Sequence, residues 1–433
     1  GLRIAGRYLG STGESAAEYL RWLEKKPFKE LGDGEHQEEN AALLLRRSVA
    51  QVSDDARLAL AVAGTLAFAP IAREPVAAVL EDNERRARKA LGELVNYGLL
   101  EKREERWQIS HALIHTYART ELALSKENLE RLAFYYFQYC EIQSAAGREG
   151  YIHLAAERVH YLQLMESCLD NELWQEVQVL SEAIREYLDL QGWWKEQLVA
   201  LEMRLTATQQ ADDPRDKGIC LNSLGYTCWK YGKFELALQW YEQSLSIWRE
   251  RKDRQGEGVV LNNIAMIYQQ QDKYEQALNY FQQSLSIRQE IDDHDGEGAT
   301  LNNIGHLHYN QGDYEQALYY YEQCLPIVRE VGNKIGEGST LNNIGLTYRA
   351  QGKPSEAVEY YKQSLVIRRE QGDRAGEAVT CWNLGLTYED MGDLAKAEKH
   401  ISLAVQIAEQ IKSPYLEQWR DGLAHVRAMR QGA

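Results

Sequence analysis

Apolar and polar positions recur along the second half of the chain with a period of 40 residues. The stretches LNSLGYTCWKYGKFELAL, LNNIAMIYQQQDKYEQAL, LNNIGHLHYNQGDYEQAL, LNNIGLTYRAQGKPSEAV and CWNLGLTYEDMGDLAKAE begin at Leu221, Leu261, Leu301, Leu341 and Cys381. Blocks 261–300 and 301–340 are identical at 19 of 40 positions. A fixed period of this size predicts a stacked solenoid of like units. Such an extended surface favours binding over catalysis.

Each unit reads as two helices. Leu261, Ile264 and Tyr268 follow the spacing i, i+3, i+7 of an amphipathic helix, and a second such run covers residues 274–287. The turn between the two helices carries a glycine, which ends a helix easily in a left-handed conformation. These glycines are Gly232, Gly312, Gly352 and Gly392.

Small residues recur inside both helices. In the first helix they are Gly225, Ala265, Gly305, Gly345 and Gly385; in the second, Ala237, Ala277, Ala317, Ala357 and Ala397. Glycine inside a helix costs about 1 kcal/mol relative to alanine, so we expect close packing, small residue against small residue, as compensation. This pattern resembles the tetratricopeptide repeat. The 40-residue length and the LNNIG wording are similar to the kinesin light chain subtype.

The array is predicted to contain five repeats over residues 213–412. Residues 126–212 read as irregular helices and degenerate repeats, in which we assign Trp193 and Trp194 to the repeat core. A capping helix is expected over residues 413–433, because a terminal repeat needs a polar cover.

Residues 37–125 have a different pattern. Amphipathic helices are expected over 40–52, after Asp54 and over RRARKALGELVNYGLL, followed by a charged hairpin, EKREERWQIS, and the helix HALIHTYART. Three helices followed by a two-stranded wing predict a winged-helix domain. The chain is therefore expected to be all-α, with one small β-wing.

The segment WQISHALIHTYAR resembles the motif that closes the winged-helix domain of NB-ARC (STAND) signal-transduction ATPases. That family has Met-His-Asp where this chain has Ser110-His111-Ala112, so the histidine alone matches. The resemblance implies that His111 contacts the β-phosphate of ADP and holds a closed, inactive state.

Residues 1–36 resemble the end of the family's helical lid. No GxxxxGK[ST] motif occurs in the chain. We therefore expect a fragment that is not itself an enzyme and binds no cofactor. ADP or ATP with magnesium would bind in the full-length protein, whose nucleotide-binding domain would contact this part in cis. Oligomerisation is expected only of the activated full-length protein.

Other interpretations stay open at two places. His111 and His115 are four residues apart and could form a metal pair, although no third ligand is evident. Arg85, Arg86, Arg88 and Lys89 fall on the helix that reads DNA in winged-helix regulators, but acidic residues surround them. The alternative function is a tetratricopeptide-repeat adaptor or transcription regulator with a DNA-binding winged helix.

Asparagine columns are the candidate ligand-binding feature of the repeats. The first column is Asn222, Asn262, Asn302 and Asn342, and the second is Asn263, Asn303, Asn343 and Asn383. Asparagine is a poor residue for a helix interior. Two explanations remain: the amides clamp the backbone of a protein or peptide in the concave groove, or they join one repeat to the next. The neighbouring side chains vary and would select the ligand: Tyr226, Met266, His306, Tyr309 and Arg349.

Charge and cysteine content narrow the choice of partners. The net charge is −16, which argues against nucleic acid or an anionic membrane as the main partner. Six cysteines without CxxC spacing fit free thiols in a reducing cytoplasm better than disulfides or zinc. No apolar run reaches the length of a membrane span. We therefore expect a cytoplasmic regulatory and sensor region.

Overall fold

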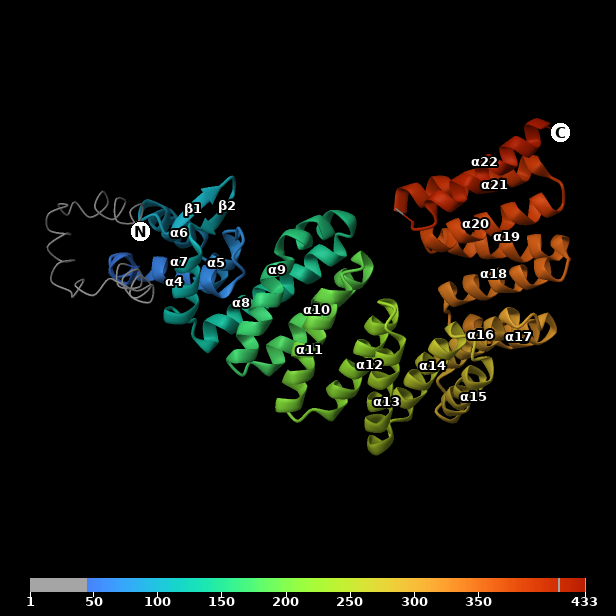
Figure 1. The fold of residues 1–433 in the computed structure, drawn as a ribbon, viewed down its shortest axis with the longest axis horizontal. Helices are drawn as coiled ribbons and strands as arrows, with labels where there is room; N and C mark the ends of the chain where they lie inside the picture. Colours follow the sequence, from blue (N-terminus) through green and yellow to red (C-terminus); the bar gives the residue numbers. More distant parts are fainter. Residues whose placement is uncertain (1–44, 412, 433) are drawn as a thin grey trace, which may run out of the picture. The chain divides into compact units, whose positions relative to one another are not determined.

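The computed structural model describes residues 45–411 and 413–432. The described chain is helical apart from one β-hairpin (Figure 1). It divides into two compact units, residues 1–232 and 233–433, and each is described by itself. The predicted lid remnant, residues 1–36, lies outside the described residues. Of the helix expected over 40–52, residues 45–50 are described, and they are helical.

The first unit begins with the element order expected of a winged helix. The elements are α4 (Asp54–Thr65), α5 (Glu74–Val79), α6 (Glu84–Asn96), β1 (Leu100–Arg103), β2 (Arg106–Ile109) and α7 (Ala112–Glu121). The hairpin is antiparallel, with Leu100 opposite Ile109, and Ile71 adds an isolated bridge to Trp107. Ser53 caps α4 by accepting the N–H of Ala56, as its position before two acidic residues favours.

Five longer helices complete the first unit. They are α8 (Lys126–Ala145), α9 (Arg148–Asp170), α10 (Trp174–Gln191), α11 (Trp194–Gln210) and α12 (Pro214–Lys230). One continuous core runs from Leu45 to Ala207, so the regions before and after residue 125 share their buried side chains. Trp193 and Trp194 are half-buried rather than central. The guanidinium of Arg158 lies 3.0 Å from the centre of the Trp193 ring, which places this ring at the edge of the core.

The second unit consists of paired helices and a final cap. Its helices are α13 (Phe234–Arg251), α14 (Arg254–Gln270), α15 (Tyr274–Glu290), α16 (His294–Asn310), α17 (Tyr314–Glu330), α18 (Lys334–Ala350), α19 (Pro354–Glu370), α20 (Arg374–Asp390), α21 (Leu394–Ile411) and α22 (Leu416–Gly432). Gly312, Gly352 and Gly392 have φ between +72° and +79°, as the turn pattern predicted. The array is a tetratricopeptide-type solenoid.

The small residues of the first helix face aromatic rings, not the small residues of the second. A Cβ on Gly305 would lie 2.6 Å from Cε1 of the buried Tyr321, and one on Gly345 would lie 2.9 Å from Cε1 of Tyr361. The expectation of small-against-small packing is therefore wrong at these positions. The glycines leave room for a ring on the neighbouring helix, which compensates their poor helix propensity.

Cysteines and hydropathy add two observations. All six cysteines are buried, and burial raises the pKa of Cys168 and Cys220 to about 12. These buried thiols stay protonated and are inert. Within the described residues, no helix combines the length and the apolar character that a membrane crossing requires.

Candidate functional site

The asparagine columns of the second unit form a ladder of hydrogen bonds between successive repeats. Nδ2 of each second-column asparagine donates to Oδ1 of the first-column asparagine one repeat earlier. The bonds run from Asn303 to Asn262 at 3.1 Å, from Asn343 to Asn302 at 3.2 Å and from Asn383 to Asn342 at 3.2 Å. The ladder thus joins helices α14, α16, α18 and α20, which are the first helices of four successive repeats.

The first column is less accessible than its helical face suggested. Asn262 and Asn342 are buried, because the next first helix packs over them, whereas Asn303, Asn343 and Asn383 are half-buried. The view that the first column points away from the core is therefore wrong for Asn262 and Asn342. Their amides satisfy buried bonding groups, as the repeat-to-repeat explanation requires.

The downstream end of the ladder is marked in the sequence. Trp382 occupies the first-column position of α20, where no further repeat follows to donate a hydrogen bond. Its ring stacks on Trp419 of α22, with the ring centres 5.3 Å apart. Gly422 allows this approach, since a Cβ there would lie 2.4 Å from the Trp382 ring. An aromatic lid thus replaces the amide contact.

The ladder leaves bonding capacity in the second column. Each rung uses one of the two N–H groups of the second-column amide, and an asparagine offers two donors and an acceptor oxygen. Asn343 also accepts a bond of 3.4 Å from Nδ2 of Asn342. A ladder role and a ligand role are therefore compatible for Asn303 and Asn383. The clamp itself stays a prediction, for these residues as for Asn263.

Variable side chains lie beside the ladder. Met266 accepts a contact of 3.8 Å from Nδ2 of Asn262. His306 is exposed, and its Nδ1 lies 3.0 Å from Nε2 of Gln269. Because desolvation lowers the pKa of His306, the ring is neutral at pH 7. When Gln269 donates to Nδ1, the ring proton of His306 is on Nε2, where it can reach a ligand.

An aromatic and an ionic group continue this row. Tyr309 stacks beside His306, with the ring centres 6.3 Å apart. Arg349 donates from Nε to Asp390 at 2.6 Å and from Nη2 to the same carboxylate at 3.3 Å. The row therefore changes from sulfur and imidazole to phenol and a neutralised guanidinium along the array. This is the chemical variety that selective recognition needs.

Two predicted site residues lie on α12 of the first unit. Asn222 and Tyr226 are both half-buried. The Tyr226 ring lies 5.7 Å from that of Trp229, and Nζ of Lys230 lies 5.4 Å from the Tyr226 ring centre and 5.3 Å from that of Trp229. This end of α12 presents an aromatic pair under a cation.

His111 is the N-cap of α7. Its Nδ1 accepts the N–H of Leu113 at 3.1 Å, and the residue is exposed. Ser110 holds the preceding turn, since its Oγ donates to the carbonyl of Gly98 at 2.7 Å. Capping through Nδ1 places the proton of the neutral ring on Nε2. That N–H is the group with which His111 would bind a phosphate.

The metal-pair interpretation gains no support from the geometry. His115 uses its Nε2 in a contact of 2.8 Å with the carbonyl of Leu66. Within the described residues, no group of three or more histidine, cysteine or acidic side chains could hold a metal ion. His115 instead ties α7 to the end of α4.

The basic residues of α6 are partly neutralised. Arg86 forms two bonds with Asp55, from Nε at 2.9 Å and from Nη2 at 2.6 Å, and these hold the pKa of Asp55 below its usual range. Arg85, Arg88 and Lys89 are exposed. Glu81 and Glu84, exposed beside them, make this face mixed in charge.

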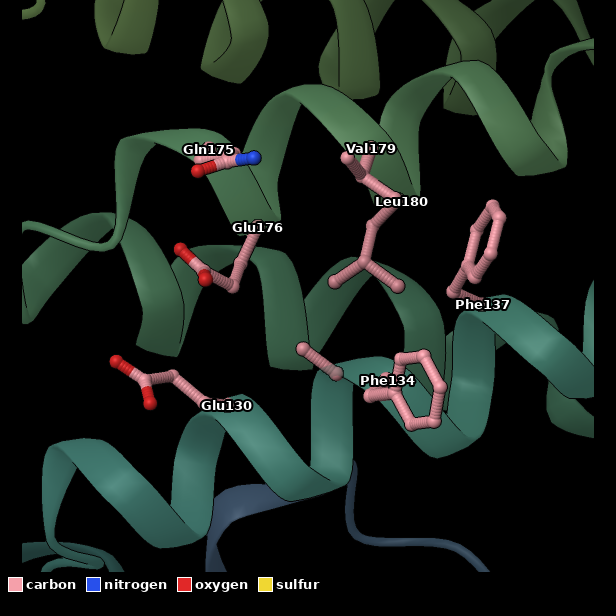
Figure 2. Close-up of a pocket in the computed structure, with 8 residues that line it drawn as sticks. Glu130, Phe134, Phe137, Gln175, Glu176, Val179 and Leu180 are labelled. Carbon is pink, nitrogen blue, oxygen red and sulfur yellow. The ribbon is translucent and has the colours of Figure 1, made fainter.

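The sequence analysis missed a pocket between α8 and α10. It has a volume of about 190 Å³, and Phe134 and Phe137 line one end, while the carboxylates of Glu130 and Glu176 line the other (Figure 2). Phe134 is 59% exposed. The only sequence signal was this aromatic residue on a face that the degenerate repeats do not cover.

Comparisons with known proteins place the fold. The family model of the tetratricopeptide repeat matches residues 256–330, 297–370 and 336–410. No curated protein matches the chain. The crystal structure of RapI in its apo form is 14% identical, with a TM-score of 0.50, over 65% of this chain and 98% of that one.

Two other solved structures are also similar. A STAND protein with a tetratricopeptide repeat sensor from Pyrococcus horikoshii is 17% identical over 99% of this chain and 69% of that one, with a TM-score of 0.49. A putative kinesin light chain with nearly identical repeats from Podosopora anserina is 17% identical over 44% of this chain and 94% of that one, with a TM-score of 0.37.

Proposed function

We propose that this chain is the regulatory and sensor part of a STAND-type switch, whose repeats bind a protein or peptide ligand. The observation that carries the proposal is the row of variable, partly exposed side chains beside a constant asparagine ladder. Met266, His306 and Tyr309 differ in chemistry at equivalent or neighbouring positions, while the amides beside them stay the same. A constant backbone contact beside variable pockets suits an extended peptide.

The winged-helix-like region has a second role in this proposal. His111 would contact the ADP of a nucleotide-binding domain in the full-length protein and thereby stabilise a resting state. Ligand binding to the repeats shifts such an equilibrium only if the ligand binds the open state more tightly than the closed one. The exposed Nε2 of His111 supports this role.

A peptide library selected on the purified chain tests the ligand site. We expect Tyr309→Ala and Arg349→Ala each to weaken the selected peptides about tenfold or more, and His306→Ala to change which peptides are preferred. Glu322→Ala on α17 is the matched control, because Glu322 is exposed on a second helix. If the selected peptides bind all three site variants as well as the native chain, the groove is not the site. The pocket at Phe134 then becomes the next candidate.

Nucleotide retention in the full-length protein tests the switch. His111→Ala should release ADP and raise ligand-independent activity, because a hydrogen bond to a charged phosphate contributes about 1.5–3 kcal/mol. His111→Asn separates this role from capping, since asparagine is a favoured N-cap. We expect both variants to lose ADP and only His111→Ala to destabilise α7. Full ADP retention in both would refute the assignment.

The alternative proposal is a DNA-binding adaptor that uses Arg85, Arg88 and Lys89. It predicts that binding to a duplex weakens as salt rises, and that replacing these three residues by alanine abolishes it. The acidic neighbours on α5 and α6 and the net charge favour the sensor proposal. Duplex binding that depends on these residues at physiological salt would reverse the preference.

A further inference from the structure

One position of the array alternates between a long and a short side chain. Arg288 and Arg368 are buried in equivalent places, 80 residues apart, and the repeat between them has Val328. Both arginines donate from Nη1 to an aspartate, Asp293 at 2.5 Å and Asp373 at 2.6 Å.

The guanidinium of each arginine fills a defined space in its repeat. It lies against the first turn of the following helix, where a Cβ on Gly296 or Gly376 would be 1.4 Å from Nη1. Arg368 also donates from Nε to Ser364 at 3.2 Å and from Nη2 to Ser339 at 3.2 Å. The site is therefore built for a planar group with several N–H donors.

The middle repeat has exchanged both members of this pair. Val328 replaces the arginine, and Asn333 replaces the aspartate. The space that remains is a pocket of about 170 Å³ between α16, α17 and α18. Its polar lining consists of Asn302, Asn303, Cys324, Asn333, Ser339 and Thr340. Two of these residues belong to the asparagine ladder, so the pocket opens beside the proposed peptide site.

A carboxylate next to the pocket sets its charge preference. Asn333 donates from Nδ2 to Oδ1 of the exposed Asp295 at 2.7 Å. The equivalent positions in the neighbouring repeats, 255, 335 and 375, hold glutamine, isoleucine and alanine. The nearby cations Arg329 and Lys334 are bound to Glu337, at 2.7 Å and 2.9 Å. A cation that enters here meets an uncompensated carboxylate.

We propose that this pocket receives an arginine side chain of the bound peptide, which takes the place that Arg288 and Arg368 take in the neighbouring repeats. The proposal rests on the proposed function and names one side chain that the ligand supplies. The guanidinium fork matches the hydroxyl of Ser339 and the amide oxygens around it. A lysine ammonium would match them less well, because it is a point charge without a planar set of donors.

The experiment uses N-acetyl-arginine-N-methylamide and its citrulline analogue as probes of the purified chain. Methyl NMR of Val328 reports on occupancy. We expect the arginine probe, but not the neutral citrulline probe, to shift the Val328 methyl signals. Asn333→Asp should tighten the arginine probe about tenfold, because a charge-assisted bond replaces a neutral one. Asp293 and Asp373 cap their helices in this same position, so the variant keeps the cap.

Val328→Arg with Asn333→Asp is the matched variant that fills the pocket from within. It rebuilds the pair of the neighbouring repeats, and we expect it to abolish probe binding, read by calorimetry. Should this variant fail to fold, the gain in Asn333→Asp still decides the question. Equal binding of arginine and citrulline probes to the native chain and to Asn333→Asp would overturn the proposal.

The test separates this proposal from the proposed function. A chain that binds the probe but no peptide in the groove would refute the sensor proposal alone. A chain whose selected peptides bind the pocket-filled variant undiminished would refute the arginine pocket alone.

Discussion

The repeat array and the first unit stabilise their helices in opposite ways. The array repeats the same few contacts every 40 residues, whereas the first unit relies on one set of long-range contacts that occurs once. The comparison shows which parts of the molecule can vary independently. In a repeat array each unit contacts mainly its neighbours, so a single repeat can change its chemistry without disturbing the others.

The contact that occurs once is centred on Glu157 of α9. The carboxylate is buried and pairs with Arg106 of β2. Tyr136 of α8, also buried, donates from its hydroxyl to the other carboxylate oxygen at 2.9 Å. Arg106 further donates to the carbonyl of Pro70 at 3.0 Å, and His160 contacts that carbonyl at 3.2 Å. These bonds tie the hairpin to the first two long helices.

The recurring contacts of the array are shorter in range. Ser284 and Ser364 each donate to the carbonyl 26 residues earlier at 2.7 Å, and the thiol of Cys324 takes the same place at 3.1 Å. Glu257, Glu337 and Glu377 are buried. Each carboxylate is held between two cations, one at the end of the preceding helix and one three residues before the glutamate: Arg249 and Arg254, Arg329 and Lys334, and Arg369 and Arg374.

The largest expected effect breaks the contact that occurs once. Glu157→Ala leaves the buried hydroxyl of Tyr136 and the guanidinium of Arg106 without their acceptor. Removing one partner of a buried pair costs about 3–5 kcal/mol. We expect hydrogen exchange to accelerate in α8 and α9 and to stay unchanged in α16 and α18.

Glu166→Ala is the matched control for this prediction. Glu166 lies on the same helix and pairs with Arg119 at 2.9 Å, but both side chains are substantially exposed. An exposed pair contributes about 0–1 kcal/mol. Equal destabilisation by the two variants would show that the Glu157 contact is not special.

The contrast between the units explains how much could be predicted from the sequence. The helix pairs, the turn glycines and the capping helix were predicted correctly, because a period of 40 samples each position several times. The hairpin was also predicted, from its charged turn between two apolar runs. The contact of Glu157 with Arg106 spans 51 residues and occurs once, so no repetition in the sequence announces it.

The site was predicted less completely than the fold. The asparagine columns were found, but their partners were not, because a helical wheel shows the face of a residue and not what packs on it. Asn262 therefore read as exposed, although the next repeat covers it. The pocket at Val328 is visible in the sequence only as the loss of an arginine and an aspartate that the neighbouring repeats have.

A middle-sized effect tests the ring-on-glycine packing of the array. Gly305→Ala places a methyl 2.6 Å from the Tyr321 ring. Overpacking costs about 1–3 kcal/mol, which exceeds the gain of roughly 1 kcal/mol in helix propensity. The preceding repeat has Ala265 and Phe281 in one buried cluster. Adding Tyr321→Phe should therefore recover part of the loss in a double-mutant cycle of urea unfolding. A variant Gly305→Ala as stable as the native chain would show that the ring does not require glycine.

The smallest expected effect concerns acid and the buried Glu337. Burial raises the pKa of Glu337, but bonds from Lys334 and Arg329 outweigh it, and the pKa lies below its usual value. A carboxyl with a lowered folded pKa stabilises the protein above its unfolded pKa and loses this contribution as pH falls through the folded value. Glu337→Gln should therefore flatten part of the stability loss below about pH 4.5, measured by urea unfolding with hydrogen exchange of α18. Replacing Arg329 and Lys334 by methionine should reverse the sign locally. With burial alone acting, the pKa of Glu337 is raised, and α18 gains stability as the carboxyl is protonated. The same slope with pH in both variants would show that the two cations do not control this carboxylate.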